Sequence, residues 1–392
     1  MENSLENRFY ETFGHRAQYI FTAPGRTELG GNHTDHQNGI VLAAAVNMTD
    51  KAAAAFNGTC TARLFSEGFD TSEIDLSDLS VKEEEKFTTA ALIRGIARSI
   101  KDRGFSLKGF DAYITSDIPA GSGLSSSAAF EILTGAMFNR FCCDNVLQPA
   151  ELAITGQYAE NVYFGKPSGL LDQMTCALGG VVNIDFKDPG KPSAKKISTD
   201  FSSYGYSLCI INTGANHRGL TEDYALVTRE LSDVCAVFGK KRLREVPEEE
   251  FYENIPAVRK ACGDRALLRA IHVYDENRRA AMEADALTCG NFTQYLELVK
   301  ASGASSWQYL QNVIPCGSST HQEMAASIAL CSHLLNGAGA CRVQGGGFAG
   351  TVQAYVPAAM LKTFTEGIEK YLGKGSCTEV QIRSEGAVCE EC

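Results

Sequence analysis

The stretch Ile118-Pro-Ala-Gly-Ser-Gly-Leu-Ser-Ser-Ser-Ala-Ala-Phe-Glu131 decides the fold, because turn-forming residues and four hydroxyl groups lead directly into a helical pattern. Leu124, Ala128 and Ile132 recur every four residues, which predicts a helix that begins within the serines and buries one face. The first turn of such a helix has unpaired N–H groups and the positive end of the helix dipole. The pattern therefore predicts an anion-binding loop, with phosphate as its natural ligand. An ordinary glycine- and serine-rich helix cap is the alternative interpretation.

The sequence before this loop, Lys108–Thr115, alternates between apolar and polar residues as a half-buried strand does. A strand, a glycine-rich loop and a helix in succession form the geometry that a phosphate cradle needs. The loop is not a P-loop, since no G-x-x-x-x-G-K-[ST] pattern occurs, and the sequence has no protein-kinase catalytic loop.

Length and composition indicate an ordinary globular protein. The 392 residues are too many for one hydrophobic core, so we expect an N-terminal domain over residues 1–200 and a C-terminal domain over 201–392. The net charge is −11, from 36 basic and 47 acidic residues, and the sequence has no long Lys/Arg run. This balance argues against nucleic acid or an anionic membrane as a partner.

The sequence has no stretch of 18 apolar residues, and its start is polar and acidic, so we expect no membrane span and no signal peptide. The fourteen cysteines are scattered along the chain, which is typical of free thiols in a cytoplasmic protein. Cys389 and Cys392 have the spacing of a metal-ligand pair, but no second pair matches them. We expect them to be frayed, reduced thiols.

A polar loop follows the first predicted strand, Tyr19–Ala23, which we expect to end at Pro24-Gly25. The loop, residues 26–39, leads into a second apolar strand over residues 40–46, and a loop between two buried strands is a rigid place to display side chains. His33, Asp35 and His36 could bind a divalent metal ion. The same residue types could instead bind the hydroxyls of a sugar. A merely structural polar turn would explain Asn38-Gly39 but not the crowding of polar side chains.

Asp172 lies inside an apolar stretch that follows the helical run Glu151–Phe164. A carboxylate there is costly to desolvate, so we expect it to be paired, functional, or the N-cap of the next helix. Residues 187–192 form the best linker or hairpin candidate in the middle of the chain.

The second half begins with a predicted strand over residues 206–211 and a long helix from Leu220, and helical patterning continues to about residue 338. The following Gly345-x-Gly347-x-x-Gly350 formally matches the dinucleotide fingerprint. That fingerprint must open a helix, whereas a strand pattern follows here. We therefore predict a glycine-rich turn between two strands, where the backbone presses against a neighbouring loop or a ligand.

Three separated stretches together resemble one family. Pro24-Gly-Arg-x-x-x-x-Gly-x-His-Thr-Asp35, Pro119-x-Gly-x-Gly-Leu-Ser-Ser-Ser-Ala128 and Gly345-Gly-Gly-Phe-x-Gly350 resemble, in order and spacing, the three motifs of the GHMP small-molecule kinases. The first stretch and Gly169-x-x-Asp172-Gln are most similar to galactokinases. The resemblance spans nearly the whole chain and implies a two-domain α+β fold with the active site in the cleft between the domains.

The resemblance also implies a sugar 1-kinase that converts galactose and ATP to galactose 1-phosphate and ADP. Asp172 would act on the anomeric hydroxyl as a base or an orienting group, with Arg26 beside it, and Ser126 and Glu160 would hold Mg²⁺. The ATP phosphates would lie on the loop, at Pro119, Gly121, Ser122, Gly123, Leu124, Ser125, Ser126, Ser127 and Ala128. The implied sugar contacts are Asn32, His33, Asp35, Gly169 and Tyr224.

Three positions depart from the galactokinase pattern and bear on the sugar. Asn32 stands where a glutamate usually contacts the sugar 6-hydroxyl, Glu28 stands where asparagine is usual, and Asn216 replaces an arginine before His217. An amide can still bond a 6-hydroxyl, so galactose is the expected substrate. The alternative is a sugar such as galacturonate, because the loss of a negative charge at residue 32 would remove repulsion against a 6-carboxylate.

Other classes of protein stay open at this stage. A galactokinase-like sugar sensor would bind without turnover, although sensors have a damaged phosphate loop and this one is intact. A diphosphate decarboxylase of the same family would need a cationic pocket, and the loop at residues 31–38 offers no cation beyond its histidines. A metal hydrolase built on His33, Asp35 and His36 would depend on a transition metal and not on ATP. We expect a monomer, although sequence alone does not determine the oligomeric state.

Overall fold

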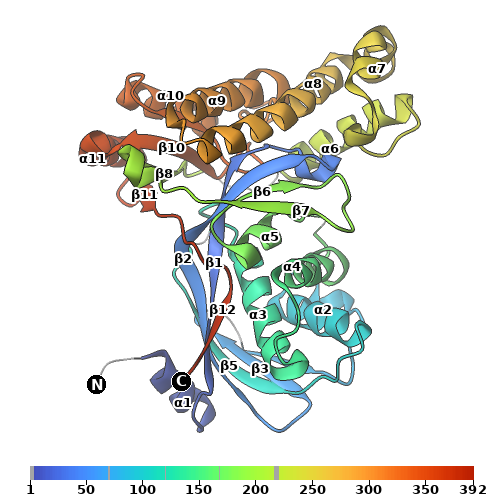
Figure 1. Cartoon of the computed structure of the whole chain (residues 1–392), viewed down its shortest axis with the longest axis vertical. Coiled ribbons are helices and arrows are strands. Elements are labelled where there is room, and N and C mark those ends of the chain that lie inside the picture. Colours follow the sequence, from blue (N-terminus) through green and yellow to red (C-terminus); the bar gives the residue numbers. More distant parts are fainter. Residues whose placement is uncertain (1–3, 69–70, 120, 167, 216–219) are drawn as a thin grey trace.

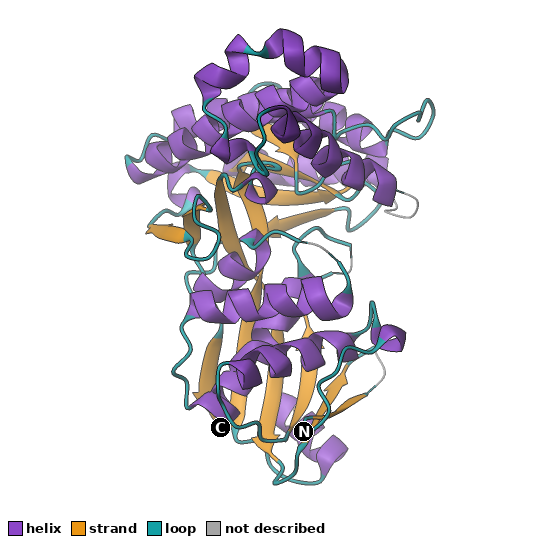
Figure 2. Cartoon of the chain, turned by 90° about the vertical axis from the view of Figure 1, so that its right-hand side faces the viewer, coloured by secondary structure: helices purple, strands orange, loops and turns teal. Residues whose placement is uncertain are grey.

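The computed structural model describes residues 4–68, 71–119, 121–166, 168–215 and 220–392. Two β-sheets, each with its own helices, follow one another along the long axis of the molecule, and both chain termini lie at the end that carries the larger sheet (Figures 1 and 2). Strands and helices mix in both halves, which confirms the predicted α+β class.

The larger sheet is built on two long antiparallel strands, β1 (Tyr19–Gly30) and β2 (Ile40–Phe56). Its order in the described chain is β12-β1-β2-β5-β3-β4, and β2 also pairs with β6, which pairs with β7. The first half of β2 pairs with β6 and its second half with β5, so the sheet splits along β2 into two branches. The other strands are β3 (Thr61–Ser66), β4 (Ser72–Asp75), β5 (Phe110–Ser116), β6 (Val181–Asp185), β7 (Ser193–Ile197) and β12 (Val388–Glu391).

Strand β1 continues past Pro24-Gly25, so the predicted end of the strand there is wrong. The ladder to β2 shifts its register between Pro24 and Arg26 and again between Glu28 and Gly30. Such bulges let a strand bend without ending. Gly25 is required at the first bulge, since a Cβ there would lie 2.8 Å from the carbonyl oxygen of Leu124.

Helices cover one face of the larger sheet (Figure 1). Ala52 and Ala54 of β2 pack with these helices, whereas Ala53 and Ala55 face the N-terminal helix α1 (Leu5–Phe13) on the opposite side. This alternation follows from the two-residue period of a strand. The covering helices are α2 (Thr89–Asp102), α3 (Ser126–Cys143), α4 (Pro149–Tyr158) with a π-helical turn over Ala159–Phe164, and α5 (Leu171–Leu178).

The smaller sheet has the order β11-β8-β10-β9. Its strands are β8 (Tyr206–Asn212), β9 (Ala340–Val343), β10 (Thr351–Pro357) and β11 (Cys377–Val380). The glycine-rich segment joins antiparallel β9 and β10, which confirms the predicted turn between two strands. The helices are α6 (Thr221–Val237), α7 (Glu248–Glu253), α8 (Ile255–Thr288), α9 (Phe292–Ser305) with a π-helical turn over Ser306–Leu310, α10 (Glu323–Leu335) and α11 (Leu361–Leu372).

The C-terminal tail returns to the larger sheet, where β12 pairs with β1. Cys389 is opposite Phe21 and is half-buried against the core, so the expectation of a frayed C-terminus is wrong there. All fourteen cysteines are free, as predicted. A domain boundary near residue 200 stays a proposal, and this tail would cross it.

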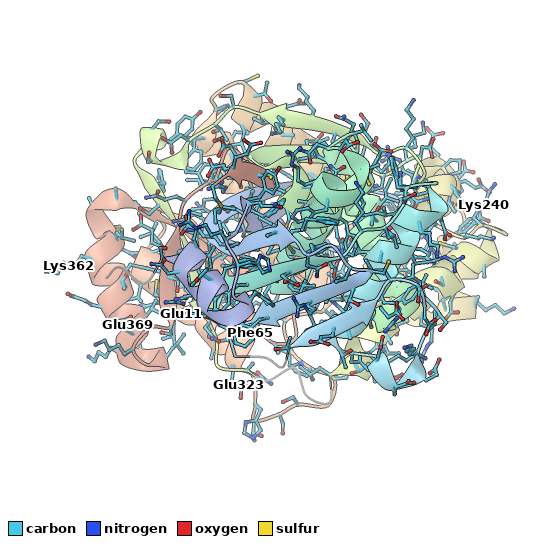
Figure 3. The ribbon with its side chains drawn as sticks, turned by 90° about the horizontal axis from the view of Figure 1, so that it is seen from below. Glu11, Phe65, Lys240, Glu323, Lys362 and Glu369 are labelled. Atoms are coloured by element: carbon cyan, nitrogen blue, oxygen red, sulfur yellow. The ribbon has the colours of Figure 1, made fainter. Side chains whose placement is uncertain are left out.

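Charged side chains cover the outside of the molecule, and acidic and basic groups are mixed there. In the view from below, Lys240, Lys362 and Glu369 lie at its edges (Figure 3). No helix in the described part of the chain is long and apolar enough to cross a membrane.

Candidate active site

The predicted phosphate loop ends at Ser125, whose left-handed backbone (φ 59°, ψ 58°) turns the chain into α3. Among the described residues no side chain caps this helix, and the Ser125 hydroxyl donates instead to Asp172. The first N–H groups of α3 therefore stay available to an anion. Of the nine predicted phosphate-binding residues, Leu124 and Ala128 are buried, so only their backbone can contact a ligand.

Contacts from two other motifs fix this loop in place. The Gly123 carbonyl accepts hydrogen bonds from Arg26 Nη1 (2.6 Å) and Gln344 Nε2 (3.0 Å), and the Arg26 N–H donates to the Leu124 carbonyl (2.9 Å). Gly123 has φ 68°, and a Cβ on it would overlap Thr351 Oγ1. The three motifs recognised in the sequence thus meet at the phosphate loop.

Arg26 and Asp172 form a bidentate ion pair, with Nε–Oδ1 and Nη2–Oδ2 distances of 2.6 and 2.7 Å. Ser125 Oγ donates to the same Oδ2 at 2.6 Å. Asp172 is the second residue of α5, and Leu170 is the N-cap, so the alternative of a capping aspartate is wrong.

The electrostatics of this pair keep Asp172 ionised. Burial by itself would raise the pKa of Asp172, but the charge and hydrogen bonds of Arg26 and the bond from Ser125 outweigh it, and the pKa lies below its usual value. A lowered pKa means that the carboxylate is negatively charged at neutral pH.

His33 in the first motif and His36 just after it are both neutral and hydrogen-bonded. His33 Nε2 lies 3.0 Å from the Gly346 carbonyl and must donate to it, so His33 Nδ1 accepts from His36 Nε2 at 3.1 Å. Burial lowers the pKa of His33 to about 4 and that of His36 to about 3. The two imidazoles thus bond to each other, and no group of three metal-ligating side chains occurs among the described residues.

Asp35 and Gly169, two predicted sugar contacts, lie side by side. A Cβ on Gly169 would overlap Asp35 Oδ2, so any larger residue there would displace the Asp35 carboxylate. Both residues line a polar crevice of about 430 Å³, together with His36 and Arg242. Burial raises the pKa of Asp35 to about 6.

Tyr224, predicted from α6, lies against the third motif. Its hydroxyl donates to the Gly347 carbonyl at 2.7 Å, and a Cβ on Gly346 would lie 2.7 Å from its ring. His33 and Tyr224 therefore both contact the glycine-rich turn. Asn216 lies outside the described residues.

Asn32 differs from the expectation that its amide contacts the sugar. The side chain is wholly buried, and its nitrogen donates to Glu28 Oε1 (2.9 Å) and the Gly345 carbonyl (2.7 Å). Its oxygen accepts from Ser306 Oγ (3.2 Å) and Asn312 Nδ2 (3.0 Å). Because every hydrogen-bonding position of the amide is used, Asn32 is a structural residue in this arrangement.

The C-terminal half supplies anchors, missed in the sequence analysis, for the polar loop of residues 26–39, which we call the sugar loop. Glu276 Oε1 accepts from the N–H groups of Gly31 and Asn32, both at 3.2 Å, and His272 Nε2 donates to the Asn32 carbonyl at 3.0 Å. Arg342 pairs with Glu28 and donates to the Leu29 carbonyl at 3.0 Å. These three side chains are fully buried.

The predicted metal ligands differ in their surroundings. Ser126 is exposed at the start of α3, whereas the Glu160 carboxylate accepts from Lys166 Nζ (2.7 Å), Gln173 Nε2 (3.0 Å) and the Ser168 hydroxyl. Gln173 also donates to Glu131, whose buried Oε1 has no partner in the described chain. Hard carboxylate oxygens held in this way suit Mg²⁺, and the ion would have to displace the Lys166 ammonium group from Glu160.

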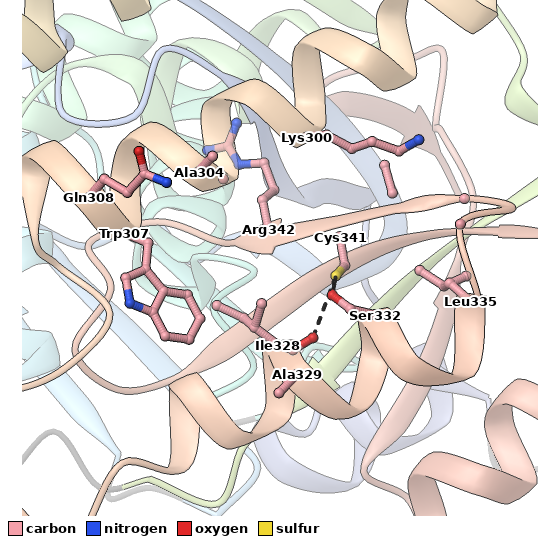
Figure 4. A pocket seen from close by; sticks show the side chains of 14 residues that line it. Lys300, Ala304, Trp307, Gln308, Ile328, Ala329, Ser332, Leu335, Cys341 and Arg342 are labelled. Carbon is pink, nitrogen blue, oxygen red and sulfur yellow. Dashed lines mark hydrogen bonds between the residues drawn. The ribbon is translucent and has the colours of Figure 1, made fainter.

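A separate pocket of about 410 Å³ lies between α9, α10 and β9 (Figure 4). Trp307, Lys300 and Ile328 line it, and the Ser332 hydroxyl and the Cys341 thiol are 3.3 Å apart at its wall. Arg342 also lines this pocket, but its guanidinium is bonded to Glu28 and to backbone carbonyls.

Comparisons with known proteins agree with this geometry. The family model for the galactokinase galactose-binding signature matches residues 7–55, and that for the GHMP kinases N terminal domain matches residues 91–180. The chain is 32% identical to a galactokinase of Actinobacillus pleuropneumoniae over 89% of this chain and 88% of that one. It is 30% identical to a galactokinase of Glaesserella parasuis over 97% of both chains.

A solved structure has nearly the same fold. The structure of Lactococcus lactis galactokinase complexed with galactose superposes with a TM-score of 0.82, at 28% identity, and the match covers 98% of both chains. Mevalonate kinase from Methanococcus jannaschii shares the fold alone, with a TM-score of 0.62 at 16% identity over 93% of this chain and 98% of that one. From the motifs that meet at one site and from these relatives, we conclude that the chain belongs to the galactokinase family of the GHMP kinases.

Proposed function

We propose that the protein is an ATP-dependent galactokinase that transfers the γ-phosphoryl group of ATP to the anomeric hydroxyl of galactose. The observation that carries the proposal is the Arg26–Asp172–Ser125 cluster, which joins the predicted sugar site to the start of α3. Galactokinase relatives over most of the chain support the choice of sugar. A monomer and a cytoplasmic location stay predictions.

In the proposed reaction, the anomeric oxygen attacks the γ-phosphorus, the bond from that phosphorus to the bridging oxygen breaks, and ADP leaves. The hydroxyl proton passes to the Asp172 carboxylate. Because the pKa of Asp172 is lowered, it is a weak base, and its main role before the new bond forms is to orient the hydroxyl.

The remaining groups stabilise charge. The free N–H groups of α3 and the Arg26 guanidinium face the negative charge of the transferred group. Ser126 and Glu160 would hold Mg²⁺, and the bound ion would neutralise part of the negative charge on the phosphates. Asp35, Gly169 and Tyr224 are the proposed sugar contacts, and His33 would join them only by giving up its bond to Gly346 or to His36.

Turnover with a panel of sugars tests the proposal. ATP consumption by the purified protein with Mg²⁺ is measured against galactose, N-acetylgalactosamine, glucose, arabinose and galacturonate, and we expect the highest kcat/KM with galactose. The variant Asp172→Asn should lose turnover and still bind ATP. Asp102→Asn, which breaks an exposed pair with Arg98, is the matched control and should be active. The proposal would be refuted if no sugar stimulated ATP consumption, or if Asp172→Asn were active.

A further inference from the structure

Glu28 lies on the reactive side of β1. Arg26 and Glu28 are two residues apart in an unshifted part of the ladder, opposite Ala45 and Ala43, so their side chains point to the same face. On that face Arg26 reaches Asp172. The Glu28 side chain therefore points toward the region where the reacting groups lie.

The two carboxylate oxygens of Glu28 have different surroundings. Oε1 accepts from Asn32 Nδ2 and from Arg342. Oε2 makes no hydrogen bond with any described residue, and it is not one of the enclosed unpaired oxygens of the described chain. Glu28 is 7% exposed, whereas Asn32 beside it is 0% exposed. One oxygen is thus fixed by the protein, and the other is left for a ligand.

The charges around Glu28 suit a neutral ligand with hydroxyl groups. Burial raises the pKa of Glu28 to about 7, although the charges of Arg342 and Arg26 and the bond from Asn32 act to lower it. Above pH 7, where Glu28 and Asp35 are both ionised, a ligand carboxylate next to them would meet two like charges, whereas a hydroxyl donates a hydrogen bond without this repulsion.

We propose that Glu28 Oε2 accepts a hydrogen bond from a hydroxyl of the bound sugar and selects neutral hexoses over hexuronates. This inference rests on the proposed sugar kinase activity and names the group that determines specificity within it. It assigns to Glu28 the sugar contact that the Asn32 amide is not free to make.

The variant Glu28→Gln tests the contact. Arg342 and Asn32 both donate to the position of Oε1, so the glutamine oxygen is held there and its NH₂ group takes the place of Oε2. The sugar hydroxyl then faces a donor. Loss of a hydrogen bond to a charged group should raise KM for galactose roughly 10- to 100-fold, while KM for ATP changes little.

Monodeoxygalactoses separate a direct contact from a structural role. The wild-type protein should lose roughly 10- to 100-fold in kcat/KM with the one analogue that lacks the contacted hydroxyl. In Glu28→Gln that penalty should shrink to within about threefold, and the penalties for the other analogues should stay. The relative rate with galacturonate should rise. Glu85→Gln, which breaks a buried pair with Arg94 away from the site, is the matched control and should keep every wild-type penalty.

The outcomes are distinguishable. Two results would overturn the inference. One is that Glu28→Gln shows the same loss of kcat/KM with every deoxygalactose as the wild type. The other is that the wild type prefers galacturonate, whose carboxylate Arg242 of the crevice could bind. If Glu28→Gln does not fold, Glu28→Asp retracts the carboxylate and should weaken the same single hydroxyl contact. Calorimetric binding without ATP separates the two proposals: Glu28-dependent binding of galactose without turnover would sustain this inference and refute the kinase, and absence of sugar binding would refute both.

Discussion

Glu276 joins α8 to the sugar loop, and its replacement by glutamine should both destabilise the protein and weaken sugar binding. Its Oε1 accepts the N–H groups of Gly31 and Asn32 and the Ser302 hydroxyl (2.6 Å), and its other oxygen pairs with Arg279. In Glu276→Gln the amide oxygen can keep some of these bonds. The NH₂ group then faces Arg279, and the charge is lost.

The magnitude follows from the pKa of Glu276. Burial by itself would raise this pKa, but His272, Arg279, Arg342 and the Ser302 bond lower it from 4.5 to about 2. A shift of that size corresponds to at most about 3 kcal/mol of folding free energy at neutral pH, because burial lowers the pKa of His272 and leaves this imidazole uncharged there. Because the pKa is lowered in the folded state, this stability is present above pH 4.5 and is lost as the pH falls toward 2.

Urea unfolding at pH 7 and at lower pH measures this difference. The free energy of unfolding of the wild type should exceed that of Glu276→Gln by more than about 1 kcal/mol and at most about 3 kcal/mol at pH 7, and the two values should converge as the pH approaches 2. The control Glu297→Gln, in an exposed pair with Lys300, should cost less than about 1 kcal/mol. KM for the sugar should rise in Glu276→Gln while KM for ATP stays. If Glu276→Gln and the control Glu297→Gln have the same free energy of unfolding at pH 7, the reasoning is refuted.

Three further predictions concern the proposed site. Burial raises the pKa of Asp35 to about 6, so KM for the sugar should increase as the pH falls through 6, and Asp35→Asn should raise KM at pH 8 and flatten this part of the profile. Gly169→Ala should lower sugar affinity at least about tenfold in calorimetry without changing ATP affinity, since its Cβ overlaps Asp35; unchanged sugar affinity would contradict this. Chelation of Mg²⁺ should abolish turnover, and Glu160→Gln should raise the Mg²⁺ concentration needed for half-maximal rate without changing sugar binding; turnover that is insensitive to chelation would contradict the metal site.

Local features of the site could be predicted because local rules determine them. The helix that starts within the serines was predicted from the four-residue spacing of Leu124, Ala128 and Ile132, and α3 begins at Ser126. The end of β1 was misplaced because Pro24-Gly25 has the composition of a turn. The long partner strand β2 keeps this segment in the ladder through a bulge, and no residue near Pro24 signals that partner.

Contacts between distant residues could not be derived in the same way. Arg26 and Asp172 are 146 positions apart, and only the family resemblance placed them together. The anchors on α8 did leave a signal that went unused. His272, Glu276 and Glu283 follow the same three- and four-residue spacing as the buried Ala280 and Leu287, so polar groups occupy the buried stripe of the helix. Polar residues on such a stripe need partners, and His272 and Glu276 find them in the sugar loop. The Glu283 carboxyl has no hydrogen-bond partner among the described residues, and burial raises its pKa.

The departures from the family pattern also have to be considered as contacts and not as single positions. Compared with the galactokinase pattern position by position, residue 32 has an amide in place of a carboxylate, and residue 28 has a carboxylate in place of an amide. In the structure the two side chains touch at 2.9 Å, so the pair still holds one carboxylate and one amide. The carboxylate is bound to Arg342 at one oxygen and open at the other, whereas the amide is enclosed. The carboxyl group that Asn32 removes from position 32 therefore returns at Glu28, and above its raised pKa of about 7 this group would repel a sugar acid, as we propose.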